Sequence, residues 1–200
     1  MSAGAGSAAR RGRLVVMSGP SGSGKTTIKE RLRRNPRVEV AVTVTTRPPR
    51  AGEVDGRDYH FVGREEFLGM KAAGRFAETN DVFGTGHLYG SLRDELERAL
   101  AQDRTYLIEV DVTGARNLRR AGFEGTYVFI APPGMEVLER RLRARGTDDE
   151  AAITSRLFRA REEMALARQD GSHVVVNNDL EQAVREVFAL AGLAQAPAGR

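Results

Sequence analysis

A short segment near the start of the chain carries the residues best suited to binding a phosphate. Gly19, Gly24, Lys25 and Thr26 satisfy the pattern G-x-x-x-x-G-K-[ST], the P-loop, and apolar residues 14–17 lead into it as a short buried strand would. Glycines let such a backbone turn its N–H groups inward, toward phosphate oxygens, at the start of the next helix. Lys25 would add charge on the β- and γ-phosphates, and the hydroxyl of Thr26 could ligate Mg²⁺. The pattern predicts a phosphate-binding loop made of Gly19, Pro20, Ser21, Gly22, Ser23, Gly24, Lys25, Thr26 and Thr27.

A second candidate phosphate contact follows about twenty residues later. Arg47 and Arg50 stand three apart on an extended segment stiffened by prolines, which suits a grip on one phosphate from two sides. Two arginines beside prolines more often belong to a solvated loop, so this reading depends on what surrounds them. Turn residues and alternating aromatic side chains come next, up to residue 62, and favour a small α/β insertion with a short helix near residues 64–71.

The end of this insertion is less regular. It would close at residues 75–78 and again at 87–91, with the glycine-rich link 84–86 between them. Ser91, with Asp94 three residues later, also fits the capped start of a helix. Ser91 could belong to the end of the insertion and also cap this helix.

Two further charged groups could serve chemistry on phosphates. Residues 106–111 read as an apolar strand that ends in acidic residues, the pattern expected beside a P-loop, with its acids at the carboxyl edge of the sheet. Four arginines lie between residues 140 and 145, followed by a glycine that suggests a mobile corner, and Arg156 lies on the next helix. An arginine run is often only a solvated helix face.

The elements that must position these residues alternate between strand and helix. We expect strands at 14–17, 38–44, 106–111, 126–130 and 174–177, and helices at 26–34 and 135–142, through an apolar stripe at 153–164, and after a cap at Asp179. Such alternation predicts an α/β fold with a parallel sheet.

Composition narrows the class of protein further. The 200 residues fit one domain, and the absence of cysteine excludes disulfides and thiolate metal sites; three scattered histidines predict no structural metal. The net charge of +4 could suggest nucleic acid, yet 27 acidic residues are interleaved with 31 basic ones and no aromatic-rich basic segment occurs. We therefore expect no nucleic acid as a partner.

The ends of the chain are expected to be irregular. Residues 1–12 are small and basic without the apolar segment of a secretory signal, which predicts a disordered tail, and residues 195–200 look frayed. Near the C-terminus the longest apolar run is far shorter than the roughly 20 residues of a membrane span. A soluble, cytoplasmic protein that does not bind membranes is the expectation.

Taken together, the segments resemble guanylate kinase, the enzyme that transfers the γ-phosphoryl group of ATP to GMP. The resemblance spans about residues 14–190, and its stretches occur in the family's order. They are SGPSGSGKTT (18–27), TTRPPRAGEVDGRDYHFV (45–62), YGS (89–91), LIEVDVTGA (107–115), FIAPPGMEVLERRLRARGTDDE (129–150) and VVNNDL (175–180).

The resemblance implies a fold and a division of the chain. It implies a P-loop kinase core with a five-stranded parallel sheet, a small GMP-binding α/β insertion and an arginine-rich lid. The guanylate-kinase-like domain would cover 13–194, with the core at 13–42 and 92–194, the GMP-binding region at 43–91 and the lid at about 141–156. ATP and GMP would be the ligands, Mg²⁺ the cofactor, and no obligate protein partner is expected.

The resemblance also implies roles for individual residues. The P-loop residues would bind ATP, with Asn177 beside the adenine and Thr26 on Mg²⁺. Lys25, Arg141, Arg145 and Arg156 would be catalytic. The GMP phosphate would be bound by Arg47, Arg50, Tyr59 and Tyr89, and the guanine by Thr43, Glu78, Ser91 and Asp111.

The sequence departs from the family's pattern at the GMP side. Thr43 stands where serine is usual, which keeps the hydroxyl and adds a methyl group. Thr79 follows Glu78 where a bulky aromatic residue or histidine is common, and Tyr89 lies eleven residues after Glu78, two more than expected. This loop is therefore expected to be rebuilt, and Glu78 could instead be a surface glutamate.

Two alternative functions share the core. A related small-molecule kinase, such as a ribose bisphosphate phosphokinase, would not need the arginines, tyrosines and Glu78 of the insertion together. A guanylate-kinase-like module that binds phosphopeptides would typically lack a working P-loop, whereas Lys25 and Thr26 are present here. Phosphoryl transfer asks for positioning and charge rather than a nucleophilic residue, which the arginine-rich inventory suits.

Overall fold

A five-stranded parallel sheet forms the centre of the computed structural model, which describes residues 12–81, 86–144, 146 and 149–193. All neighbouring strands run parallel, in the spatial order β2-β7-β1-β8-β9. The sheet therefore matches the one expected from the sequence, and its central strand β1 leads directly into the P-loop. The strands are β1 (Arg13–Ser18), β2 (Val38–Val40), β7 (Thr105–Glu109), β8 (Thr126–Ala131) and β9 (His173–Val176).

Helices cover both faces of this sheet because alternate residues of each strand point to opposite sides. Val15 and Met17 of β1 pack in one cluster with buried residues of α1 (Lys25–Arg33) and α7 (Leu180–Leu190). Leu14 and Val16 pack in the other, with α3 (Arg93–Leu100) and α4 (Val112–Arg120). The sheet is thus buried on both faces, as a parallel sheet requires.

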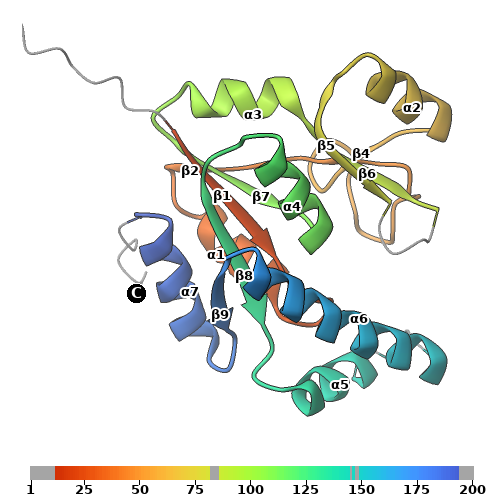
Figure 1. Ribbon diagram of the computed structural model, residues 1–200, viewed down its shortest axis with the longest axis vertical. Helices are drawn as coiled ribbons and strands as arrows, with labels where there is room; N and C mark the ends of the chain where they lie inside the picture. The colour runs from red at the N-terminus through yellow and green to blue at the C-terminus, as the bar shows by residue number, and fades with distance from the viewer. Residues whose placement is uncertain (1–11, 82–85, 145, 147–148, 194–200) are drawn as a thin grey trace, which may run out of the picture.

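Two further groups of elements extend from the carboxyl edge of the sheet (Figure 1). One is the small lobe, which holds a four-stranded sheet in the order β4-β3-β6-β5 and is covered by α2; the rings of Phe67 and Phe76 stack at 4.6 Å in its core. The other is the pair α5 and α6, which pack through Leu138, Leu142 and Ala160. Their bounds are β3 (Val44–Thr45), β4 (His60–Phe61), α2 (Arg64–Ala72), β5 (Phe76–Asp81), β6 (Leu88–Leu92), α5 (Met135–Arg143) and α6 (Glu150–Gln169).

One expected strand is wrong as a single element. Residues 38–44 divide between β2 in the central sheet and β3 in the small sheet. Just after β2, Ala41 N still donates to the carbonyl of Leu107 in the central sheet. The carbonyl of Thr43 already accepts from His60 N of the small lobe. The chain therefore crosses from one sheet to the other within residues 41–43. This crossing depends on tertiary contacts, which a run of apolar residues does not reveal.

Two local predictions about helix starts have opposite outcomes. Asp179 caps α7 as expected, with its carboxylate accepting from Gln182 N at 2.7 Å. Ser91 does not cap α3, which begins after Leu92 without a side-chain cap. Ser91 lies in β6 instead, buried, and its hydroxyl donates to Glu78. The capping interpretation is wrong because the strand continues past Ser91.

The sequence reading also lacked one helix, α4, which follows Asp111 directly. The Asp111 carboxylate caps it by accepting from Gly114 N at 2.7 Å, and Ala115 and Leu118 form its buried stripe. That cap and stripe were the available signals.

Several predictions lie outside the described residues. They concern Arg145, the tail at 195–200 and all but the last residue of the tail at 1–12. Across the part of the chain that the structure describes, no helix combines the length and the hydrophobicity needed to cross a bilayer.

Candidate active site

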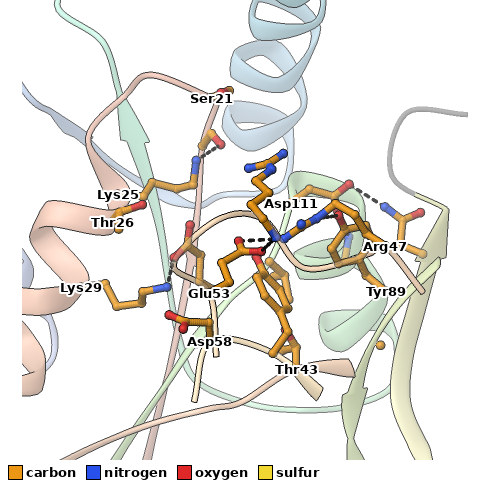
Figure 2. Close-up of a pocket in the computed structure, with 18 of the residues that line it drawn as sticks. Ser21, Lys25, Thr26, Lys29, Thr43, Arg47, Glu53, Asp58, Tyr89 and Asp111 are labelled. Atoms are coloured by element: carbon orange, nitrogen blue, oxygen red, sulfur yellow. Dashed lines mark hydrogen bonds and ion pairs between the residues drawn. The ribbon is translucent and has the colours of Figure 1, made fainter. Parts of the chain in front are cut away.

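A cavity of about 430 Å³ lies at the carboxyl edge of the central sheet, between the P-loop and the small lobe. The strand order places β1 beside β7, so the loops that leave both strands face the same space. The small lobe contributes the opposite wall through β5, β6 and the loop after β3. Figure 2 shows the P-loop residues and the small-lobe residues converging on this space from opposite sides.

The P-loop has the backbone that the sequence predicts. Gly19, Gly22 and Gly24 have φ values of 143°, 90° and 95°, which side-chain-bearing residues rarely adopt. A Cβ atom on Gly24 would also lie 2.2 Å from the amide nitrogen of Asn177. Lys25 Nζ donates to the carbonyls of Gly19 and Pro20 at 2.6 and 3.0 Å, which folds its ammonium group over the loop. These contacts hold the loop in shape and place the Lys25 ammonium group over it.

Residues from the C-terminal half of the chain brace this loop from behind. Asn177 is only 5% exposed, and its side-chain amide donates to the Ser23 carbonyl at 2.7 Å. Arg141 donates to the Asn177 carbonyl at 3.2 Å, and Arg156 donates to the Ser21 hydroxyl at 3.0 Å. The two arginines thus approach the P-loop from α5 and α6, while the place of Asn177 beside adenine stays a prediction.

Arg47 is the centre of a polar cluster on the small-lobe side. Its Nε donates to the Tyr89 hydroxyl at 3.2 Å, and its Nη2 lies 2.8 Å from the Glu53 carboxylate. The guanidinium also lies 5.4 Å from the centre of the Tyr59 ring. Burial raises the pKa of Tyr59 to about 12, so its hydroxyl keeps a proton that it can donate to an anion. Glu53 in turn accepts from the backbone N–H of Arg50 at 2.7 Å, which orders the arginine loop.

Two carboxylates converge at the far end of the cavity. Glu78 is 7% exposed; one oxygen accepts from the Ser91 hydroxyl at 2.6 Å, and the other is buried without a hydrogen-bond partner among the described residues. A Cβ atom on Gly114 would lie 3.2 Å from that unpaired Glu78 oxygen and 3.3 Å from an Asp111 oxygen, so both carboxylates border the same point. Burial raises the pKa of Glu78 to about 7. An unpaired buried oxygen is costly, and a ligand with N–H donors would satisfy it.

The longer link between Glu78 and Tyr89 does not move Tyr89 out of the site. Strands β5 and β6 pair Asn80 with Tyr89 and end the ladder at Asp81 and Leu88. Residues 82–85, which belong to the link between these strands, lie outside the described part of the chain. The expectation that the loop is rebuilt therefore does not extend to Tyr89, whose hydroxyl contacts Arg47.

Most of the predicted site residues share one cavity. Thr43, at the crossing between the sheets, lines it together with Glu78 and Asp111, whereas Ser91 reaches it only through Glu78. The predicted residues that line the cavity are Gly19, Ser21, Gly22, Gly24, Lys25, Thr26, Thr27, Thr43, Arg47, Arg50, Tyr59, Glu78, Tyr89 and Asp111.

The sequence reading missed several cavity residues. Lys29, one helical turn after Lys25, forms an ion pair of 2.7 Å with Glu109 at the end of β7 (Figure 2). Asn80 donates to Asp111 at 2.5 Å. The signal for Glu109 was its place at the end of the apolar strand, and the signal for Asn80 was its spacing of two from Glu78, which places both on one face of a strand.

Comparisons with known proteins agree with one another. A family model described as guanylate kinase matches residues 11–191. A guanylate kinase of Nitratidesulfovibrio vulgaris is 48% identical over 90% of this chain and 86% of its own length, and one of Synechococcus sp. is 44% identical over 91% and 83%. The crystal structure of guanylate kinase from Anaplasma phagocytophilum superposes with a TM-score of 0.72 at 30% identity, covering 94% of this chain and 89% of that one.

Proposed function

The chain belongs to the guanylate kinase family, and from this we propose that the two ends of its cavity bind the two nucleotides of the family's reaction. That reaction transfers the γ-phosphoryl group of ATP to GMP and yields ADP and GDP. In our proposal the P-loop binds the phosphates of ATP, and the small lobe binds GMP. The transferred group would then move across the space between Lys25 and Arg47, which line the same cavity.

The observation that carries this proposal is the buried, unpaired oxygen of Glu78 at the far end of that cavity. Guanine presents two adjacent donors, N1–H and the exocyclic 2-amine, which a carboxylate can accept together. Adenine presents a lone pair at position 1 and has no 2-amine, so it would leave the carboxylate unpaired. Sites that leave a buried polar group unpaired reject the wrong ligand by roughly 10⁴ to 10⁵. Glu78 and Asp111 would in this way select guanine.

The phosphate of GMP would bind between the guanine end and the P-loop. Arg47, Arg50, Tyr59 and Tyr89 line the cavity there and offer guanidinium and hydroxyl donors. Because Glu53 already orients Arg47 and the Arg50 backbone, little side-chain entropy would be lost when the phosphate binds. The acceptor phosphate would thus be held in line with the γ-phosphate of ATP.

The residues present fit a magnesium ion held mainly by substrate. Thr26 lines the cavity at the start of α1 and offers a hydroxyl oxygen, while no cluster of three His, Cys, Asp or Glu suited to a metal occurs in the described part of the chain. Mg²⁺ prefers such sites, with few protein oxygens and several waters and phosphates. When bound, the ion neutralises charge on the phosphates. Lys25 and the arginines would supply the remaining positive charge from the protein.

Arg141 and Arg156 would complete the phosphate site from the other side. They reach the P-loop through the Asn177 carbonyl and the Ser21 hydroxyl, so a small displacement would bring either guanidinium onto the ATP phosphates. We assign residues 141–156 as the lid that closes over ATP, and Arg145 is proposed to act with them. Closure would exclude water that could otherwise hydrolyse ATP.

A coupled assay of ADP formation tests the proposal and its alternatives together. Wild type should turn over GMP with Mg·ATP far faster than AMP, dTMP or ribose bisphosphate. Lys25→Ala should lower turnover by orders of magnitude, because the Lys25 ammonium group lies over the P-loop carbonyls, where it would meet the β- and γ-phosphates. Glu78→Leu should reduce the ratio of kcat/KM for GMP over AMP more than it affects the KM for ATP. Preference for ribose bisphosphate, or unchanged base selection in the leucine variant, would contradict the proposal.

A further inference from the structure

The side chain of Asn80 lies at the guanine end of the cavity, yet neither the P-loop pattern nor the family resemblance points to it. Because residues two apart on a strand face the same side, Asn80 follows Glu78 on β5 into the cavity. Its Nδ2 donates to Asp111 Oδ2 at 2.5 Å, the bond drawn as a dashed line beside Asp111 in Figure 2. Only the amide nitrogen of Asn80 can face a carboxylate in this way.

The Asp111 carboxylate is therefore fixed at both of its oxygens. Oδ1 accepts from Gly114 N, which ties the side chain to the start of α4, and Oδ2 accepts from Asn80. The backbone at the start of α4 holds the carboxylate from one side, and the bond from Asn80 holds Oδ2 from the other, so the two together set the plane of the group. Each oxygen keeps lone-pair capacity for one ligand donor.

Asn80 also counters the cost of placing two carboxylates in one buried site. Burial raises the pKa of Asp111, whereas its hydrogen bonds with Gly114, Asn80 and Thr113 act in the opposite direction. The nearby charge of Asp111 in turn contributes to the raised pKa of Glu78. A neutral amide donor is the group that can stabilise one carboxylate without adding a net charge that would compete with the ligand.

We propose that Asn80 is a positioning residue for base selection, which holds the Asp111 carboxylate aimed at the exocyclic 2-amine of the acceptor nucleotide. This inference rests on the proposed placement of guanine between Glu78 and Asp111. Glu78 would accept N1–H and one hydrogen of the 2-amine, and Asp111 would accept the other. The chemistry that Asn80 serves is thus the discrimination of 2-aminopurines from purines without that group.

The charges around Asp111 come from three other elements. Glu78 approaches from β5, Lys25 acts from α1, and Glu163 acts from α6. Arg159 and Glu162 of α6 line a small cavity of about 130 Å³ on the far side of Asp111. Every variant below keeps these groups, so their charges are the same in all of the comparisons.

The first test compares GMP with IMP, which lacks only the 2-amine, in wild type and Asn80→Ala. Wild type should favour GMP. Asn80→Ala should raise the KM for GMP roughly tenfold or more, as expected when a hydrogen bond to a charged group is removed, with KM for IMP and kcat nearly unchanged. Asp81→Ala serves as the matched control, because Asp81 is the next residue of β5 and is exposed outside the cavity. It should keep the wild-type ratio.

A second variant separates positioning from simple loss of packing. Asn80→Asp keeps the shape of the side chain but replaces the donor with a second carboxylate. Two adjacent carboxylates share one proton at low pH, which restores a donor toward Asp111, and repel when both are ionised. Relative to wild type at the same pH, its KM for GMP should therefore rise steeply as the pH increases, whereas that of Asn80→Ala should not.

A double-mutant cycle with Asp111→Asn, which keeps an oxygen to cap α4, identifies the route of the effect. If Asn80 acts through Asp111, Asn80→Ala should change GMP selection little in the Asp111→Asn background. Wild type that does not distinguish GMP from IMP would overturn the guanine placement and the inference with it. Wild type that distinguishes them, with Asn80→Ala keeping the full ratio, would overturn the inference alone. Equal KM changes for both substrates in Asn80→Ala would reduce Asn80 to a packing residue.

Discussion

A buried carboxylate on α6 leads to a sharp prediction about stability. Glu163 is 7% exposed, and one of its oxygens has no hydrogen-bond partner among the described residues. Burial raises its pKa to about 7; the positive charge of Lys25 lowers it and the negative charge of Asp111 raises it. The perturbation that tests this is Glu163→Gln, which keeps the shape of the side chain and removes the charge.

The sign and size of the effect follow from proton linkage. Because the pKa is raised on folding from about 4.5 to about 7, the native state holds a proton over this range that the unfolded chain releases. The contribution of Glu163 to stability is therefore fully present below about pH 4.5 and is lost as the pH rises through 7. With about 1.4 kcal/mol for each pKa unit, ionised Glu163 costs the native state about 3 kcal/mol above pH 7. Glutamine avoids this cost at every pH.

The assay is urea unfolding followed by far-UV circular dichroism at about pH 5 and about pH 8. The difference in unfolding free energy between Glu163→Gln and wild type should shift by about 2 kcal/mol in favour of the variant between these conditions. Using the change between two pH values cancels any fixed cost of the amide. Glu162→Gln is the control, since Glu162 is the exposed neighbour on the same helix, and it should show no such shift. A difference that does not depend on pH would refute the reasoning.

Three further predictions concern the cavity. Gly24→Ala should destabilise the protein by more than about 1 kcal/mol and weaken ATP binding, because its Cβ would lie 2.2 Å from the Asn177 amide at a φ of 95°. Thermal unfolding and nucleotide titration measure the two effects, and an unchanged unfolding midpoint would contradict the prediction. GMP affinity should fall as the pH drops through about 7, where Glu78 takes up a proton. In Glu78→Gln the GMP affinity should depend less on pH. Calorimetric titrations in which the variant keeps the wild-type pH dependence would exclude Glu78 as its source. Solution scattering should show a more compact enzyme with a bisubstrate analogue than without it, and coincident profiles would exclude large-scale closure.

Features carried by contiguous residues could be predicted from the sequence. The P-loop turn depends on glycines within one short segment, and the cap at Asp179 depends on a residue three positions away. The alternation of strands and helices likewise follows from local hydrophobic periodicity. These elements fix where the phosphate end of the cavity must be.

Features that depend on distant partners could not be predicted in the same way. Ala41 bonds to Leu107 of the core sheet, 66 residues later, and Thr43 bonds to His60 of the small lobe, 17 residues later, whereas the apolar run 38–44 itself gives no sign of the change. The apolar stripe of α4 is weak because small residues, Gly114 and Ala115, stand between Val112 and Leu118. The role of Asn80 can be recognised only once β5 is known to lie beside Asp111. In the sequence, Glu163 looks like one more charged residue on the exposed face of a helix.

The way the small lobe joins the core has a consequence for how such enzymes diversify. The chain enters the lobe at Thr43 and leaves it through β6, where Val44 pairs with Gly90, so the two connections lie side by side. The lobe also has its own core of Val44, Phe67 and Phe76. A segment with adjacent ends and a separate core is exchangeable, in the way that inserted domains are. Recombination between relatives at these two points would exchange Glu78 together with the arginines and tyrosines proposed to bind the acceptor phosphate, while Asp111 and the P-loop would stay with the recipient core.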